Sequence, residues 1–284
     1  MSTYQTFFQE MRSRLQPMYE ADEAIAIAKL FLTSATGFSY TQALTADRPI
    51  PPVTAQMITE SIEQLAGGRP VQYVLGRTTF CGHSFRCDER ALIPRPETEE
   101  LVQWILEETS GTDGLQILDV GTGTGCIAIS LALALPTAQV TALDISPGAL
   151  ALARNNAESL GARMQFRQGD FLSPPETLFP EHRFDIIVSN PPYIPQQEAE
   201  TMHRNVRDYE PAQALFVPDA DALLFYRQLA EAGPSLLTPT GQMYCETHRD
   251  FADATADLFR TYGFREVALR NDLFGAPRMV RAAR

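Results

Sequence analysis

The sequence has few features that would place it in a membrane or around a metal. No apolar run reaches the length of about 18 residues that a membrane-spanning helix needs. The N-terminal residues also lack the basic and apolar regions of a signal peptide, so we expect a cytoplasmic protein. The four cysteines form no CxxC pair, and the four histidines form no ligand-spaced cluster with them. We therefore expect free thiols and no bound metal.

Positive charge is also scarce. The chain has 23 Lys and Arg against 35 Asp and Glu, which gives a formal net charge of −12. Because affinity for nucleic-acid phosphates rests on Lys and Arg, this balance disfavours direct nucleic-acid binding as the main task, although a local basic patch can exist on an acidic chain. A protein or small-molecule substrate fits better, and we expect a monomer.

The apolar pattern divides the 284 residues near residue 70. Residues 1–70 carry apolar positions at helical spacing in the segments 4–16, 21–33 and 53–65, which predicts a small helical domain. Residues 71–93 are rich in Tyr, Val, Phe and Gly, and this composition predicts a hairpin linker. In residues 94–284 strand and helix patterns alternate, which predicts an α/β fold with a doubly wound, Rossmann-like, mostly parallel sheet of seven strands.

A glycine-rich turn ends the first strand of the α/β part. Its candidate cofactor ligands are Asp119, Gly121, Thr122, Gly123, Thr124 and Gly125. The second strand ends about 20 residues further on at Asp144 and Ile145, where a carboxylate can accept both hydroxyls of a ribose. The third strand ends at Asp170 and Phe171, an acid and a ring suited to an adenine. No Lys-Ser/Thr pair follows the glycines, so S-adenosylmethionine fits this site better than a phosphate-bearing nicotinamide cofactor, which remains the alternative.

The tetrapeptide Asn190-Pro191-Pro192-Tyr193 directly follows the buried-strand pattern of residues 184–189. The prolines restrict the backbone, so the side chain of Asn190 and the carbonyl of Pro191 are presented stiffly as two acceptors at the end of a strand. A planar NH2 group held by both acceptors could be covered by the ring of Tyr193. A proline-rich exit loop with a chance tyrosine is the structural alternative.

Five further elements narrow the interpretation: residues 72–76 (QYVLG), 93–99 (IPRPETE), 190–195 (NPPYIP), 209–211 (YEP) and 272–278 (DLFGAPR). Together with the glycine turn, Asp144 and Asp170, they resemble the HemK/PrmC family of peptide chain release factor glutamine methyltransferases. This resemblance covers nearly the whole chain beyond the first helices. Arg95, between two prolines, is then a candidate substrate contact, whereas by itself it is equally a solvated linker charge.

The resemblance implies a class I S-adenosylmethionine-dependent methyltransferase that releases S-adenosylhomocysteine and uses no metal. Gly121 to Gly125 would line the methionine part, Asp144 would hold the ribose, and Asp170 with Phe171 would flank the adenine. Asn190 and the Pro191 carbonyl would hold a glutamine amide, with Tyr193 on its plane. The implied substrate is the glutamine of the Gly-Gly-Gln motif in class I release factors, which residues 1–70 would recognise.

Three other functions stay open at this point: methylation of a ribosomal-protein glutamine, methylation of adenine in a nucleic acid, and a non-catalytic adaptor that binds the cofactor. Two segments also depart from the family pattern. Residues 215–223 lack expected glycines, and Glu246-Thr247-His248 replaces an expected Glu-Ile-Gly. These departures concern loop geometry and substrate docking. We expect His203 and His248 to be ordinary surface or core residues, not catalytic bases.

Overall fold

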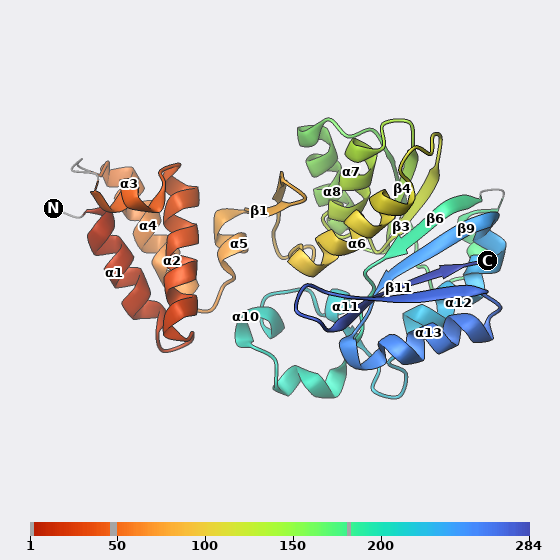
Figure 1. Cartoon of the computed structure of the whole chain (residues 1–284). Coiled ribbons are helices and arrows are strands. Elements are labelled where there is room, and N and C mark those ends of the chain that lie inside the picture. The colour runs from red at the N-terminus through yellow and green to blue at the C-terminus, as the bar shows by residue number, and fades with distance from the viewer. Residues whose placement is uncertain (1–2, 46–49, 181–182) are drawn as a thin grey trace. The chain divides into compact units, whose positions relative to one another are not determined.

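The computed structural model describes residues 3–45, 50–180 and 183–284 (Figure 1). The chain divides into two compact units, Met1–Arg77 with His203–Tyr209, and Thr78–Met202 with Glu210–Arg284. We call the first the helical unit and the second the α/β unit. Among the described residues no helix combines the length and apolarity needed to cross a membrane.

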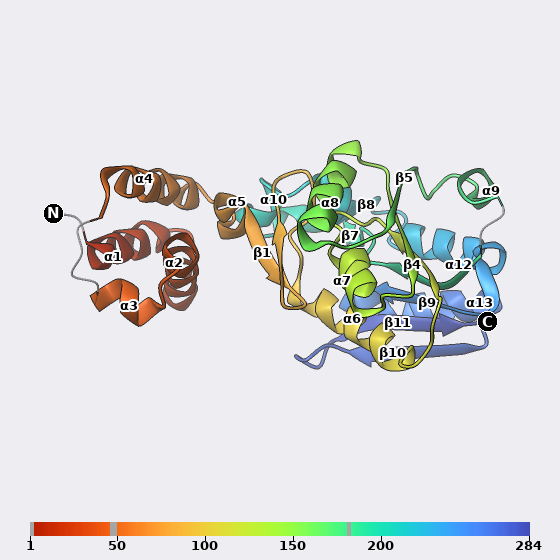
Figure 2. The same cartoon turned by 90° about the horizontal axis from the view of Figure 1, so that it is seen from above.

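The helical unit is a bundle, as predicted. Its helices are α1 (Tyr4–Leu15), α2 (Ala21–Thr36), α3 (Tyr40–Thr45), α4 (Pro52–Ala66) and α5 (Val71–Leu75). Figures 1 and 2 show α1 to α4 gathered side by side, and their apolar faces form one core that includes Met11, Phe31 and Ile62. Thr3 begins α1 with a capping box, and Gly37 in the left-handed conformation ends α2. These local signals explain why the helix boundaries follow the sequence pattern closely.

The prediction of a hairpin from residue 71 was wrong at its start. Residues 71–75 form α5, because Pro70 stands at its N-cap and Gly76, at φ 66°, ends it in the left-handed conformation. The hairpin itself is shorter and consists of β1 (Arg77–Phe80) and β2 (His83–Arg86). Cys81 and Gly82 both have positive φ and form its turn.

One segment from the second half of the chain belongs to the helical unit. The short helix α10 (Arg204–Arg207) begins at His203, whose ring stacks on Tyr19 with 5.1 Å between the ring centroids. The Nε2 atom of His203 lies 3.2 Å from the carbonyl oxygen of Met18, and the hydroxyl of Tyr209 donates to the carbonyl of Gly67 at 3.0 Å. His203 is thus a structural residue, in line with the expectation from the sequence.

The α/β unit contains the predicted seven-stranded sheet, in the order β10-β11-β9-β6-β3-β4-β5. Its strands are β3 (Gln116–Val120), β4 (Gln139–Asp144), β5 (Gln165–Gln168), β6 (Phe184–Ser189), β9 (Leu237–Glu246), β10 (Glu266–Asn271) and β11 (Pro277–Ala283). β11 runs opposite to the other six strands of this sheet. The sheet is therefore mostly parallel and, because its strand order reverses direction, doubly wound.

Helices cover both faces of this sheet (Figure 1). On one face lie α6 (Pro96–Glu108), α7 (Cys126–Ala134) and α8 (Pro147–Leu160), and on the other lie α12 (Leu224–Leu236) and α13 (Ala252–Thr261). Successive strand residues point to opposite faces, so that Ile117 joins the α6–α7 core while Leu118 joins the α12–α13 core. Burial on both faces explains the continuous apolar runs of the strands.

The remaining elements of the α/β unit are short. They are α9 (Pro175–Leu178), the 3-10 helices η1 (Gln196–Glu200) and η2 (Arg249–Phe251), α11 (Ala212–Leu215), and the paired strands β7 (Ile194–Pro195) and β8 (Phe216–Val217). Strand β7 directly follows the Asn-Pro-Pro-Tyr segment, so its pairing with β8 places residues 216–217 beside the end of that segment. All four cysteines are free, and three of them are buried.

Candidate active site

The parallel strands β4, β3 and β6 end level with one another. Val120 at the end of β3 is in register with Leu143 of β4 and with Ser189 of β6. The residues that follow these positions, including the glycine turn and Asn190, therefore emerge at the same edge of the sheet. A cavity of about 250 Å³ opens there within the α/β unit. This is the position at which open α/β sheets bind ligands.

Most of the site residues predicted from the sequence line this cavity. They are Arg95, Gly121, Thr122, Gly123, Thr124, Asp144, Ile145, Asp170, Phe171, Asn190, Pro191 and Pro192. Three predicted residues, Asp119, Gly125 and Tyr193, are not on its wall. Segments that are separated by almost 100 residues in the sequence thus share one cavity.

The glycine turn depends on glycine for its backbone shape. Gly121, Gly123 and Gly125 all have φ between 58° and 83°, the left-handed region that other residues rarely adopt. A Cβ added to Gly125 would lie 2.8 Å from Cδ1 of Ile129 and 3.1 Å from Cβ of Ala153. Gly125 therefore permits close packing at the start of α7, which explains why it lies behind the cavity wall.

Asp119 supports the turn from the interior. Its fully buried carboxylate accepts hydrogen bonds from Oγ1 of Thr122 at 2.7 Å and from the backbone N–H of Ala128 at 3.3 Å. Within the described part of the chain its other oxygen has no hydrogen-bond partner. Burial raises the pKa of Asp119 to about 7, because the charged form loses its hydration.

Asp144 faces the cavity with both carboxylate oxygens already oriented. One oxygen accepts from the backbone N–H of Gly123 at 2.8 Å, and the other accepts from the N–H of Ser146 at 2.9 Å. Burial raises the pKa of this carboxyl as well, while these N–H groups act in the opposite direction. Each carboxylate oxygen can accept more than one hydrogen bond, so Asp144 can hold a vicinal diol.

The far end of the cavity is more apolar. Phe171 is buried, whereas Ile145 and Leu172 expose 43% and 38% of their surfaces although they are aliphatic. Asp170 accepts from the backbone N–H of Leu172 at 2.9 Å, which fixes its carboxylate beside these side chains. Flat apolar walls with an acceptor at their edge suit a purine base with an exocyclic amine.

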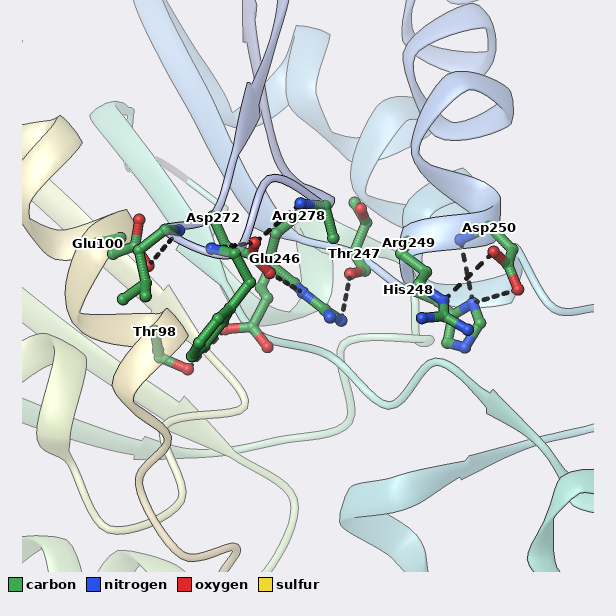
Figure 3. Close-up of polar contacts among 12 residues, drawn as sticks. Thr98, Glu100, Glu246, Thr247, His248, Arg249, Asp250, Asp272 and Arg278 are labelled. Atoms are coloured by element: carbon green, nitrogen blue, oxygen red, sulfur yellow. Dashed lines mark hydrogen bonds and ion pairs between the residues drawn. The ribbon is translucent and has the colours of Figure 1, made fainter. Parts of the chain in front are cut away.

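Asn190 is held by side chains from two other elements. Its Nδ2 donates to Oγ1 of Thr98 on α6 at 3.1 Å, and Thr98 donates in turn to Glu246 at the end of β9 at 2.5 Å. Figure 3 shows Thr98 and Glu246 pointing toward each other. Sequence reasoning missed both residues as members of the site, although Thr98 lies in the quoted segment 93–99 and Glu246 opens one of the two departures.

Tyr193 is anchored through its hydroxyl group. Its hydroxyl donates to the second carboxylate oxygen of Glu246 at 3.1 Å, and its ring packs against the core beneath α12. Burial, followed by the negative charge of Glu246, raises the pKa of Tyr193. Tyr193 is not among the residues that line the cavity, and its contact with the substrate stays a prediction.

Arg95 is fixed by a buried carboxylate. Its guanidinium lies 2.5 Å from Oε1 of Glu210, whose side chain is only 1% exposed, and the other oxygen of Glu210 accepts from the N–H of Ile93 at 3.0 Å. The segments 93–99 and 209–211 are therefore linked through this pair. Arg95 is not a freely solvated linker charge.

Residues 246–248, the second departure from the family pattern, lie off the cavity wall. Thr247 is fully buried, and its N–H donates to the carbonyl of Arg278 at 2.7 Å. The guanidinium of Arg278 is 3.4 Å from both the Thr247 carbonyl and Asp272 (Figure 3). His248 lies beside Tyr193, with 6.1 Å between the ring centroids, and it does not line the cavity.

The charges on the cavity wall indicate the kind of cofactor that fits. Asp144 and Asp170 supply acceptors, and the two arginines on the wall, Arg90 and Arg95, are each paired with a carboxylate. A pyrophosphate would need free donors, whereas a nucleoside with a cationic side chain fits this set. The fold and the site together are those of a class I methyltransferase, a class whose methyl donor is S-adenosylmethionine.

Comparisons with known proteins identify the family. A methyltransferase-domain model matches residues 111–272, and a PrmC N-terminal domain model matches residues 7–76. The release factor glutamine methyltransferase of Bacteroides thetaiotaomicron is 41% identical over 96% of this chain and 98% of its own length. That of Flavobacterium psychrophilum is 45% identical over 77% of this chain and 76% of its own. The chain belongs to the release factor glutamine methyltransferase family.

Solved structures share the fold alone. The 16S rRNA N2 G1207 methyltransferase of T. thermophilus, solved with AdoMet and guanosine, superposes with a TM-score of 0.52 at 18% identity. The match covers 73% of this chain and 49% of that chain, so about half of the larger protein is represented. The methyltransferase domain of METTL16 gives a TM-score of 0.52 at 17% identity over 70% of this chain and 87% of its own.

Proposed function

We propose that this enzyme transfers a methyl group from S-adenosylmethionine to the side-chain amide nitrogen of the glutamine in the Gly-Gly-Gln motif of class I release factors. The observation that carries the proposal is the meeting of Asn190 and Pro191 with Gly121 to Thr124 and Asp144 on one cavity wall. Acceptors for a planar NH2 group and ligands for a nucleoside therefore face the same space. The family membership of the chain agrees with this chemistry.

Different residues of the cavity wall are assigned to different parts of the cofactor. In the proposal, Gly121 to Thr124 lie along its methionine part, Asp144 accepts the ribose hydroxyls, and Asp170 with Phe171 flanks the adenine. The bound cofactor supplies an electrophilic methyl group and leaves as S-adenosylhomocysteine. No metal is required for this transfer.

The protein must make a poor nucleophile reactive. An amide nitrogen is weakly nucleophilic because its lone pair is delocalised into the carbonyl. If Asn190 Oδ1 and the Pro191 carbonyl each accept one N–H of the glutamine, the negative potential at the nitrogen rises and its position is fixed. Placement of the two reactants contributes up to roughly 7–11 kcal/mol to lowering the barrier. Of the described residues that line the cavity, none is a histidine, and we propose that the proton leaves to water.

The other parts of the chain are assigned to recognition. We propose that residues 1–70 recognise the release factor, that residues 71–93 link the domains, and that residues 94–284 bind the cofactor. Arg95, tied to Glu210, would contact the substrate beside Asn190. Tyr193, tied to Glu246, would pack on the plane of the glutamine amide. We further propose a cytoplasmic monomer that does not bind nucleic acid directly.

The test uses the intact enzyme with purified release factor and isotope-labelled S-adenosylmethionine. Mass spectrometry should find one methyl group on the glutamine of the Gly-Gly-Gln motif, and none on a factor in which that glutamine is alanine. Asn190→Ala should bind cofactor but transfer little label. Cofactor binding without any modification of the factor would reject the proposal, and label on a ribosomal-protein glutamine instead would redirect it.

A further inference from the structure

We propose that Glu246 is a positioning residue that acts through Thr98 to determine which end of the Asn190 side-chain amide faces the substrate. This inference rests on the proposed function, because it concerns how the glutamine NH2 group is recognised. The evidence is the directional chain of hydrogen bonds Asn190 to Thr98 to Glu246.

An asparagine side chain has two ends of nearly the same shape and opposite hydrogen-bonding character. Its oxygen only accepts, and its NH2 group only donates. The NH2 group of a substrate glutamine needs an acceptor, so Asn190 is productive only when its oxygen is directed to the cavity. With the NH2 group in that place, the same side chain would repel the substrate amide and attract a carboxylate.

Thr98 selects between the two ends because its hydroxyl has a single proton. An ionised carboxylate has no proton to give, so Glu246 can only accept from Thr98, at 2.5 Å. The oxygen of Thr98 is then left to accept, and it does so from Nδ2 of Asn190 at 3.1 Å. A negative charge at the end of β9 thus determines the polarity of a side chain at the end of β6.

The surroundings of Glu246 maintain this arrangement. The residue is 2% exposed, and its second carboxylate oxygen accepts from Tyr193 at 3.1 Å. Arg278 supplies the positive charge that favours the ionised form and is itself anchored by Asp272 (Figure 3). Burial, and to a smaller extent Glu97, raise the pKa of Glu246 against these contacts. A protonated Glu246 could donate its own proton to the oxygen of Thr98. The hydroxyl of Thr98 would then donate to the Asn190 oxygen, and the direction of both hydrogen bonds would be reversed.

The experiment measures selectivity, because a merely structural role would not change it. The intact enzyme is saturated with S-adenosylhomocysteine, and calorimetry gives its affinity for two purified release factors, one with the native Gly-Gly-Gln motif and one with glutamate in place of that glutamine. The variants are Glu246→Gln, which has no charge and permits either polarity, Thr98→Val, which removes the hydroxyl, and Thr98→Ser, which keeps it. Glu108→Gln is the control. Glu108 is the last residue of α6 and also accepts hydrogen bonds from side chains, those of Trp104 and Tyr244, but within the described part of the chain no hydrogen bond joins it to Asn190.

In wild type and in Glu108→Gln, we expect the glutamine form to bind more tightly than the glutamate form. Glu246→Gln and Thr98→Val should shift this ratio toward the glutamate form by about 10-fold or more, the size of one hydrogen bond to a charged group. Thr98→Ser keeps the hydroxyl, so we expect it to show the wild-type ratio of affinities for the two factors. Affinity for S-adenosylhomocysteine should not change in any variant.

An unchanged ratio in Glu246→Gln, measured on a folded protein that binds S-adenosylhomocysteine normally, would overturn the inference while leaving the proposed function intact. A Thr98→Ser variant as unselective as Thr98→Val would also overturn it. If the wild-type enzyme modifies no release factor, the proposed function fails, and the inference fails with it.

Discussion

Replacing Arg95 should destabilise the α/β unit more than replacing its partner Glu210. The Glu210 side chain is 1% exposed, whereas that of Arg95 is 30% exposed. Arg95→Met keeps the apolar stem but leaves a buried carboxylate with, among the described residues, only the N–H of Ile93 as a donor. Glu210→Gln instead leaves a guanidinium that can turn toward water. Removing the arginine should therefore cost more stability than neutralising the glutamate of the same ion pair.

The expected magnitudes follow from this asymmetry. Removing one partner of a buried pair costs roughly 3–5 kcal/mol, and the partial exposure of Arg95 places Arg95→Met near the lower end of that range. Glu210→Gln keeps an acceptor for the backbone and should cost about 1 kcal/mol. Arg90→Met is the matched control, because Arg90 also lines the cavity but pairs with the more exposed Asp88, and should cost about 0–1 kcal/mol.

Urea unfolding at neutral pH, followed by tryptophan fluorescence, measures these differences. Trp104 is the single tryptophan and lies on α6, which begins next to Arg95, so its signal reports the α/β unit and not the helical unit. We expect the midpoint to fall most for Arg95→Met, less for Glu210→Gln and least for Arg90→Met. Equal losses for the two partners, or a larger loss for Glu210→Gln, would refute the reasoning.

Three further predictions use the same protein. Asn190→Ala should lower kcat by about 100-fold or more with unchanged cofactor affinity, because one oriented acceptor is lost; a kcat close to wild type would count against its role. Gly125→Ala should lower the free energy of unfolding by about 1–3 kcal/mol more than Gly161→Ala. Both glycines have positive φ, but the added Cβ would lie 2.8 Å from Ile129 at Gly125 and would have no neighbour within 4 Å at Gly161. Tryptophan-monitored unfolding measures the difference, and equal losses would contradict it. Burial raises the folded-state pKa of Asp119 to about 7 from the ordinary 3.8, so its contribution to stability is full below about pH 4 and is lost as the pH rises through 7. Asp119→Asn should reduce this loss of stability between pH 4 and 7, and identical pH profiles would contradict the assignment.

The elements that the sequence predicted well are those determined by local patterns. The buried strands have continuous apolar runs, and the helices have capping residues, left-handed glycines or prolines at their ends. Parallel strands place their carboxyl ends at one edge, so the pattern of β3, β4 and β6 was enough to expect Asp144 and Asn190 on one cavity. The failure at residues 71–75 has a local cause too, since a five-residue apolar stretch is compatible with either a strand or a helix.

The contacts that were not predicted depend on tertiary structure. Thr98 is on α6, Glu246 ends β9 and Asn190 directly follows β6, and no sequence spacing indicates that their side chains meet. The same holds for the hydrogen bond between the Tyr193 hydroxyl and Glu246. Packing of residues 203–209 with the helical unit could not be inferred either, because their sequence lies within the α/β part.

The most direct test of the central claim is the site of methylation on an intact release factor. After incubation of the full-length enzyme with S-adenosylmethionine and the factor, peptide mass spectrometry should place a single methyl group on the side chain of the glutamine in the Gly-Gly-Gln motif, and Asn190→Ala should abolish it. A wild-type enzyme that binds the cofactor but leaves this glutamine unmodified would contradict the account.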